Sequence, residues 1–116
     1  MAAVERLICA AADLADRGRG VRFEIERYGV REPAFVVRFG GRVYGYLNRC
    51  AHVPVELDWQ PGEFFDDSGL YLVCATHGAL YAPESGRCQG GRCNGNGLQP
   101  VVVVERDDQI FLVESE

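Results

Sequence analysis

The sequence contains only short apolar runs and only two histidines, and it lacks the fingerprints of several protein classes. Its first apolar run, Leu7 to Ala12, is too short to cross a membrane or to form the core of a signal peptide, and it ends at Asp13. No G-x-G-x-x-G segment marks a nicotinamide or flavin site. We therefore expect a cytoplasmic protein that does not span a membrane and does not accept hydride by itself.

The composition is that of one globular domain with an acidic excess. The 116 residues are 47% hydrophobic, which allows one core and leaves little room for a second site. The formal net charge is -5. Nucleic acids and anionic membranes attract surfaces rich in lysine and arginine, so neither is expected as a partner.

The residue patterns on either side of the middle of the chain are typical of β-strands. Apolar and charged residues alternate over 21–26, as they do in a half-buried strand. Segments 34–39 and 42–47 flank Gly40-Gly41, a two-residue hairpin turn. A second hairpin is predicted from strands 101–104 and 110–113 around a turn at 105–109.

No helical pattern of useful length and no internal repeat is present, although the polar connection 13–20 has room for one helical turn. Residues 48–97 differ from the rest because they hold eight of the 14 glycines, which marks loops. The sequence therefore predicts an all-β, antiparallel fold. A β base of residues 1–47 and 98–116 receives a loop-rich insertion, 48–97.

Two short boxes inside this insertion each combine a thiol with an imidazole. They are Cys50-Ala51-His52 and Cys74-Ala75-Thr76-His77, and residues 53–73 between them are enough for the two loops to fold together. Such boxes bind metal. Structural zinc is one alternative, but zinc fingers usually pair Cys with Cys and His with His. Here each box holds one Cys and one His.

C-x-H followed by C-x-x-H, continuing as CATHGALYAPESGRC, resembles the cluster loops of Rieske iron–sulfur proteins. The resemblance covers nearly the whole chain and implies a β-sandwich base with an inserted cluster-binding subdomain. It also implies one 2Fe–2S cluster, in which two His replace two Cys on one iron. The implied ligands are Cys50 and Cys74 on the inner iron, and His52 and His77 on the outer iron.

Departures from the family pattern indicate its low-potential ferredoxin type. High-potential members join the two loops by a disulfide, but the matching positions here are Val55 and Thr76. They also have a Ser that donates to a bridging sulfide, where this chain has Ala79. Tyr81 matches a Tyr that donates to a ligand sulfur, although a tyrosine packed in the core is an equal alternative.

Two glycine positions bear on the same loops. Gly78 directly follows a ligand and permits the backbone to approach the cluster, with its amide aimed at it. A third loop of the family usually places Gly-Pro over the cluster, whereas this chain has Gly90-Gly91-Arg92.

The histidine count separates a carrier from an enzyme. Rieske oxygenases need a second iron held by two His and a carboxylate, and both histidines are committed here. We therefore expect no catalytic residue and a one-electron carrier between redox partner proteins, a reductase and an acceptor such as an oxygenase. The alternative is a structural or regulatory, redox-sensing metal module.

The remaining candidates are cysteines and apolar side chains. Five cysteines in an unexported chain favour thiols over disulfides. We accordingly expect structural or incidental thiols at Cys9, a buried strand residue, and at Cys88 and Cys93.

Apolar side chains beside and between the boxes are further candidates. An apolar docking rim or simple packing is expected for Val53, Pro54 and Leu80, and a small core under the acidic inter-box loop for Trp59, Phe64 and Phe65.

Overall fold

The computed structural model describes residues 3–27, 29–51, 55–76, 78–91, 93 and 96–115. These residues form ten strands and one short 3-10 helix, which confirms the predicted all-β fold. The named strands pair antiparallel in three sheets. The elements in chain order are β1 (Ala3–Ala10), η1 (Ala11–Asp13), β2 (Val21–Arg27), β3 (Val30–Phe39), β4 (Arg42–Leu47), β5 (Leu72–Val73), β6 (Leu80–Tyr81), β7 (Cys88–Gly90), β8 (Pro100–Val101), β9 (Val103–Arg106) and β10 (Gln109–Ser115).

The four-stranded sheet has the order β2-β3-β4-β8 and contains the first predicted hairpin. Phe39 pairs with Arg42 across the turn, and Gly40 and Gly41 have φ angles of 62° and 83°. Glycine adopts two successive positive φ angles without a steric cost, which is why this pair turns the chain. The predicted hairpin is therefore confirmed.

The three-stranded sheet β1-β10-β9 contains the second hairpin, whose predicted turn is too long. Strand β9 continues through Arg106 and β10 begins at Gln109, so only Asp107 and Asp108 remain in the turn. Their φ angles are 52° and 61°, a conformation that Asp tolerates better than most residues. The prediction of a turn over 105–109 is thus corrected.

Strand β3 separates two cores, because both of its faces are covered. Ala34, Phe35, Val36 and Val37 are all 0% exposed. Ala34 and Val36 pack between the two large sheets, whereas Phe35 and Val37 pack on the opposite side, against the loop region. The alternation of a strand thus lets one segment support both the base and the candidate site.

The valine run near the C-terminus crosses from one large sheet to the other. Val101 in β8 pairs with Gly45 of β4, whereas Val103 begins β9. Val102 between them is 62% exposed. The single strand predicted over 101–104 is therefore divided, because its two ends belong to different sheets.

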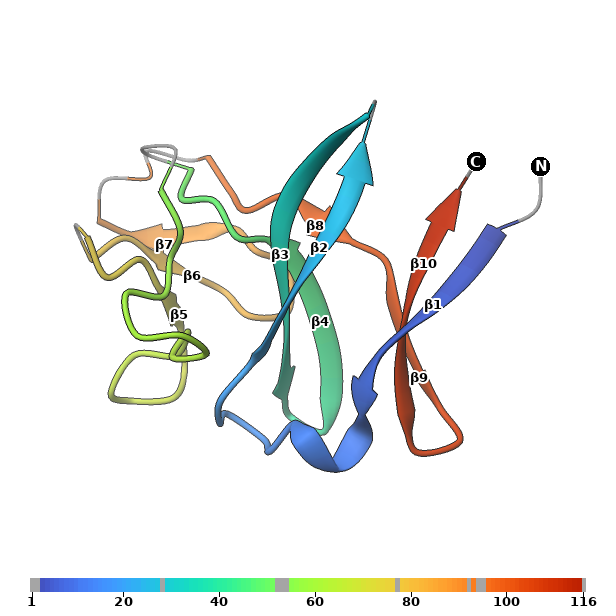
Figure 1. The fold of residues 1–116 in the computed structure, drawn as a ribbon. Coiled ribbons are helices and arrows are strands. Elements are labelled where there is room, and N and C mark those ends of the chain that lie inside the picture. The colour runs from blue at the N-terminus through green and yellow to red at the C-terminus, as the bar shows by residue number, and fades with distance from the viewer. Residues whose placement is uncertain are drawn as a thin grey trace.

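The third sheet, β5-β6-β7, has strands of only two or three residues. It lies on the left in Figure 1, with β2, β3 and β4 between it and the sheet of β1, β9 and β10. Tyr81 of β6 packs with Tyr46 of β4 and Phe35 of β3 in one buried cluster. Side chains from the base therefore pack beneath the loop region.

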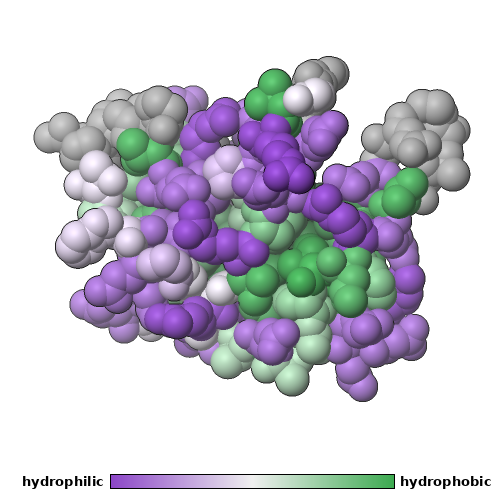
Figure 2. Space-filling model, viewed as in Figure 1, coloured by the Kyte–Doolittle hydropathy of each residue, from purple (hydrophilic) through white to green (hydrophobic). Residues whose placement is uncertain are grey.

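Apolar surface remains exposed on one face of the base. Figure 2 shows it in green among polar residues. A hollow between β1 and β2 is lined by Leu7, Ile8, Phe23 and Ile25, together with charged neighbours. Within the described ranges, no helix has the length and apolar character needed to cross a membrane.

Candidate metal centre

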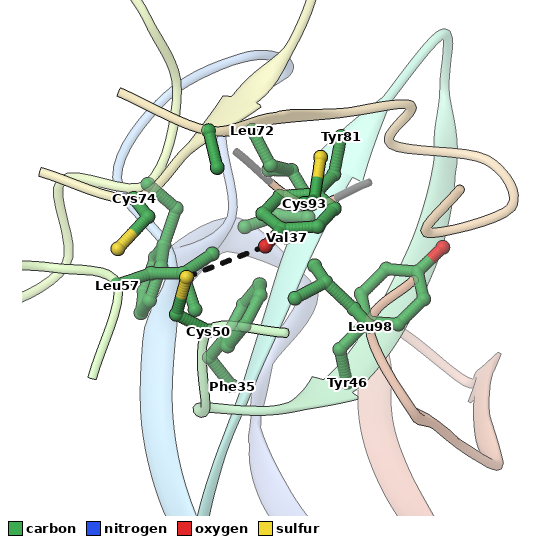
Figure 3. Packing of buried hydrophobic residues seen from close by; sticks show 12 residues of the cluster. Phe35, Val37, Tyr46, Cys50, Leu57, Leu72, Cys74, Tyr81, Cys93 and Leu98 are labelled. Atoms are coloured by element: carbon green, nitrogen blue, oxygen red, sulfur yellow. Dashed lines mark hydrogen bonds between the residues drawn. The ribbon is translucent and has the colours of Figure 1, made fainter. Parts of the chain in front are cut away.

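Cys50 and Cys74 lie in the buried cluster that β3 and β4 share with the third sheet. Their exposed fractions are 3% and 0%, and neither forms a disulfide. Leu57, fully buried, packs in the same cluster, and Figure 3 draws it beside both cysteines. Two thiols distant in sequence therefore reach one apolar site.

Backbone hydrogen bonds join the two boxes. The Cys50 N–H donates to the Val55 carbonyl at 2.8 Å, which closes the first loop. The Ala75 N–H donates to the Leu57 carbonyl at 3.0 Å, which connects the second loop to the first. The loops fold against each other, as their spacing in the sequence predicts.

His52 and His77, the other two predicted ligands, lie outside the described residues, as do Val53, Pro54 and Arg92. Within the described part of the chain, no three His, Cys, Asp or Glu side chains converge on a metal position. Leu80, the described member of the suggested docking rim, is half-buried. The ligand set therefore remains a prediction, of which the structure locates the two cysteines.

Tyr81 connects the third sheet to the first box. Its side chain is 0% exposed, and its hydroxyl lies 3.4 Å from Cys50 Sγ. The Ala51 N–H donates to the same hydroxyl oxygen at 3.0 Å, so the phenol proton is available for the sulfur. Figure 3 draws the contact with Cys50. Burial, together with the hydrogen bond to Cys50, raises the Tyr81 pKa and keeps the phenol protonated at neutral pH.

The second box closes into a tight loop around Gly78 and Ala79. The Cys74 N–H donates to the Ala79 carbonyl at 2.9 Å, and the Gly78 N–H donates to the Cys74 carbonyl at 2.8 Å. Gly78 has φ 74°, which suits glycine. Its amide is thus used within the loop rather than aimed at the site, a correction to the sequence-based expectation. Ala79 is fully buried.

A buried polar pair, which the sequence did not reveal, supports the first box. Asn48 Nδ2 donates to Asp58 Oδ1 at 2.9 Å, and the Leu57 N–H donates to Asn48 Oδ1 at 2.8 Å. Asp58 Oδ2 accepts from the Gly62 N–H at 2.9 Å and pairs with Arg22 at 3.4 Å. These bonds satisfy buried polar groups and hold Leu57 between the two thiols. No motif signalled them.

Cys88 and Cys93 form a disulfide, which corrects the expectation of thiols at these positions. Their Cα atoms are 5.7 Å apart, a normal separation for the bond. Cys9 lies in β1, as predicted, but is only half-buried, and burial raises the pKa of its thiol. The pairing was missed because cysteine connectivity cannot be deduced from one sequence.

The aromatic residues of the inter-box loop have different environments. Phe64 is 0% exposed and stacks on Phe35 with ring centroids 3.9 Å apart. Phe65 is half-buried and packs against the same cluster. Trp59 is 86% exposed, so its predicted place in a small core is wrong. Its neighbour Asp58 occupies the buried position instead.

The family of the chain follows from a comparison with protein-family models. The model of the Rieske [2Fe-2S] domain matches residues 5–105. The chain belongs to the Rieske family. No curated protein sequence matches it.

Solved structures of Rieske proteins have the same fold. The ferredoxin of carbazole 1,9a-dioxygenase from Nocardioides aromaticivorans IC177 has TM-score 0.73 and 20% identity, covering 97% of this chain and 99% of that one. The Sphingomonas yanoikuyae B1 ferredoxin has TM-score 0.72 and 18% identity over 97% of this chain and 100% of its own. A complex of reduced oxygenase and oxidized ferredoxin in carbazole 1,9a-dioxygenase has TM-score 0.71 and 20% identity, over 94% of this chain and 92% of the matched chain.

The cofactor of this Rieske domain is one 2Fe–2S cluster, and the described residues fit it. Cys50 and Cys74 are buried in a common apolar site, and a protonated hydroxyl is in contact with one of the sulfurs. Such a donor suits a sulfur that carries negative charge. These residues therefore fit an iron–sulfur cluster, which is held by cysteine thiolates.

Proposed function

We propose that this Rieske protein is a one-electron carrier that accepts electrons from a reductase and delivers them to an acceptor such as an oxygenase. One 2Fe–2S cluster would be held by Cys50, His52, Cys74 and His77. The observation that carries the proposal is the burial of Cys50 and Cys74 in one core, with the Tyr81 hydroxyl 3.4 Å from Cys50 Sγ.

The surrounding side chains have distinct roles in this proposal. When bound, the cluster supplies a one-electron couple. Cys50 and Cys74 hold it from the buried side, and Leu57 and Ala79, both 0% exposed, exclude water from the sulfurs. Because a thiolate has no proton to donate, the Tyr81 hydroxyl would donate to the Cys50 sulfur. Because a hydrogen bond favours the more negative state, this contact stabilises the reduced form.

The type of acceptor is supported by what similar structures contain. One of the matched structures is a complex of a ferredoxin with an oxygenase, and the chain resembles two ferredoxins over 99% and 100% of their length. Ala79 offers no hydroxyl to the cluster, and neither Val55 nor Thr76 is a cysteine. Both features favour the low-potential type. We also propose that the protein is cytoplasmic.

We also propose that the single Rieske domain divides into a base, residues 1–47 and 98–116, and a cluster-binding subdomain, 48–97. The two large sheets use only residues of the base, and β5, β6 and β7 lie within the insertion. The shared core of Phe35, Tyr46 and Tyr81 then makes the base the support of the subdomain.

Electron transfer is tested with the anaerobically purified protein and two partner proteins. A flavin-containing reductase with NADH should bleach its visible absorption, and addition of an oxidised oxygenase component should restore it. The isolated chain should form no hydroxylated product with NADH and oxygen. A Cys74→Ser control should give no bleaching. A coloured wild-type protein that neither the reductase nor dithionite reduces would contradict a carrier role.

A further inference from the structure

The Cys88–Cys93 disulfide has no part in the function described so far. It bridges two residues five positions apart, and it encloses Gly90 and Gly91. Cys88 belongs to β7, where it pairs with Tyr81 of β6. The disulfide is therefore one strand away from the tyrosine that contacts Cys50.

The disulfide also shares its core with the proposed thiolate ligands. Cys93 is 0% exposed and belongs to the same buried cluster as Cys50 and Cys74. Figure 3 shows Cys93 beside Tyr81. One core thus contains two cysteines that must be reduced to bind iron and a pair that is oxidised. In the cytoplasm, where we propose that this protein acts, a disulfide is usually transient and catalytic or redox-sensing rather than structural.

A close backbone contact connects the disulfide loop to the second box. A Cβ atom at Gly91 would lie 2.9 Å from Ala79 Cα and 3.1 Å from the Gly78 carbonyl oxygen. Gly91 also has φ 83°. Gly91, which lies between the two disulfide cysteines, is therefore packed directly on the backbone of Gly78 and Ala79, in the segment that follows Cys74.

The two cysteines are unequal in exposure. Cys88 is half-buried, whereas Cys93 is 0% exposed, so Cys88 is the residue open to an external thiolate. Cys93 Sγ lies 3.3 Å from the Gly90 carbonyl oxygen and 3.7 Å from that of Leu80. A disulfide sulfur carries no proton, but a Cys93 thiol would find these two acceptors already in place. The reduced state therefore leaves no unsatisfied buried thiol.

We propose that Cys88–Cys93 is a reversible redox site for dithiol reductants, and that its reduction loosens the Gly91 contact with Gly78 and Ala79 and so weakens retention of the cluster. A thiolate of the dithiol attacks Cys88 Sγ, and the Cys93 sulfur leaves and takes up a proton. The second thiol of the reductant then resolves the mixed disulfide. The reductant becomes a disulfide, and two electrons and two protons reach the protein.

The redox step is measured by thiol trapping on the folded holoprotein, prepared without oxygen or added thiols. The protein is incubated with increasing dithiothreitol, alkylated, and analysed by peptide mass spectrometry. Cys88 and Cys93 should become alkylated together, and oxidised dithiothreitol in excess should restore the disulfide. A pair that opens only after denaturation, or that is already reduced in the anaerobic preparation, would overturn the proposal of a redox site.

The effect of disulfide reduction on cluster retention rests on the proposed function. It is measured as the loss of visible absorption after an iron chelator is added. Reduction should speed this loss by about tenfold or more, the scale expected for removal of a crosslink. The Cys88→Ser/Cys93→Ser double variant should lose its cluster equally fast and should not respond to dithiothreitol. Cys9→Ser, distant from the site, serves as the matched control and should behave as the wild type.

Two glycine variants test the route from the disulfide to the second box. Gly91→Ala should speed cluster loss with the disulfide intact, because its Cβ meets the Ala79 backbone and its φ of 83° favours glycine. Gly90→Ala should not, because a Cβ there meets no atom within 4 Å. Equal rates in both variants would overturn the route. Thiol trapping does not depend on a bound cluster. A protein without a 2Fe–2S cluster would therefore contradict the proposed function, and the reduction of Cys88–Cys93 could still be measured.

Discussion

The base and the loop region of this protein are stabilised in different ways. The base has strands of up to ten residues, such as β3, whose ladders pair over their whole length. The loop region has strands of two or three residues and depends on individual contacts. Those contacts are the Asn48–Asp58 pair, the Tyr81 hydroxyl and the Cys88–Cys93 disulfide.

The small fold presents its cofactor site on loops that a regular sheet supports. Regular ladders satisfy the backbone of the base without help from a ligand. The loops have few such ladders, so side chains and turns must hold the positions of Cys50 and Cys74. We expect changes in the base to alter stability and changes in the loops to alter the cluster. Changes in the core that both regions share should alter both stability and the cluster.

The largest effect is expected from Phe35→Ala, which should damage both regions. Phe35 is fully buried and stacks on Phe64 of the loop region. Its truncation should lower the free energy of unfolding by about 3–5 kcal/mol and speed cluster loss. Urea unfolding followed by circular dichroism measures the first quantity. Val30→Ala on the same strand, 60% exposed, should change it by less than about 0.5 kcal/mol.

Asn48→Ala should affect the loop region more than the base. It removes a donor to Asp58 and an acceptor for the Leu57 N–H, leaving buried polar groups unsatisfied at a cost of about 1–3 kcal/mol. Hydrogen exchange should therefore rise at the Leu57 amide and remain slow in β3. Glu56→Gln, at an exposed pair with Arg22, is the control. Equal protection loss in β3 would contradict separate stabilisation of the two regions.

The two regions also differ in how well the sequence predicts them. The first hairpin was predictable because alternation and Gly40-Gly41 are local signals of strand and turn. Asp107-Asp108 is a weaker turn signal than a glycine pair, so the second turn was placed too broadly. The split of the valine run at Val102 depends on which sheet each strand joins, and no local pattern encodes that choice.

In the loop region, the two Cys-His boxes predicted more of the structure than the periodicity of apolar residues did. The two boxes indicated Cys50 and Cys74, which the structure brings into one core. Trp59 was misplaced because hydrophobicity alone does not give burial where a strand or helix period is absent. The Cys88–Cys93 disulfide depends on how β7 turns against β6, a tertiary feature that spacing does not reveal.

Tyr81→Phe should lower the reduction potential while leaving the base unchanged. The variant removes a hydrogen bond to Cys50 worth on the order of 1.5 kcal/mol, and a tenfold one-electron change is about 59 mV, so the expected shift is several tens of millivolts. Ala79→Ser, which adds a hydroxyl, should raise the potential. Protein-film voltammetry measures both. A potential unchanged in Tyr81→Phe, with the cluster intact, would leave Tyr81 with a packing role only.

A smaller effect is expected in the base at Arg38 and Glu105. The Arg38 guanidinium donates to the Glu105 carboxylate at 2.6 Å and lowers the pKa of that carboxyl below its usual 4.5. The folded state therefore binds this proton more weakly than the unfolded state, and the contribution is present above pH 4.5 and lost as pH falls. Glu105→Gln should cost up to about 1 kcal/mol at pH 7 and less at pH 3, measured by urea unfolding. A cost that grows on acidification would contradict the pairing.

The presence of a Rieske cluster in the two boxes is tested most directly by iron and acid-labile sulfide analysis of the anaerobically purified wild-type protein, with its visible spectrum. We predict about two irons and two sulfides per chain and a red-brown colour. His52→Ala and His77→Ala should each lose this stoichiometry. A colourless protein with stoichiometric zinc would show that the boxes hold zinc and not a 2Fe–2S cluster.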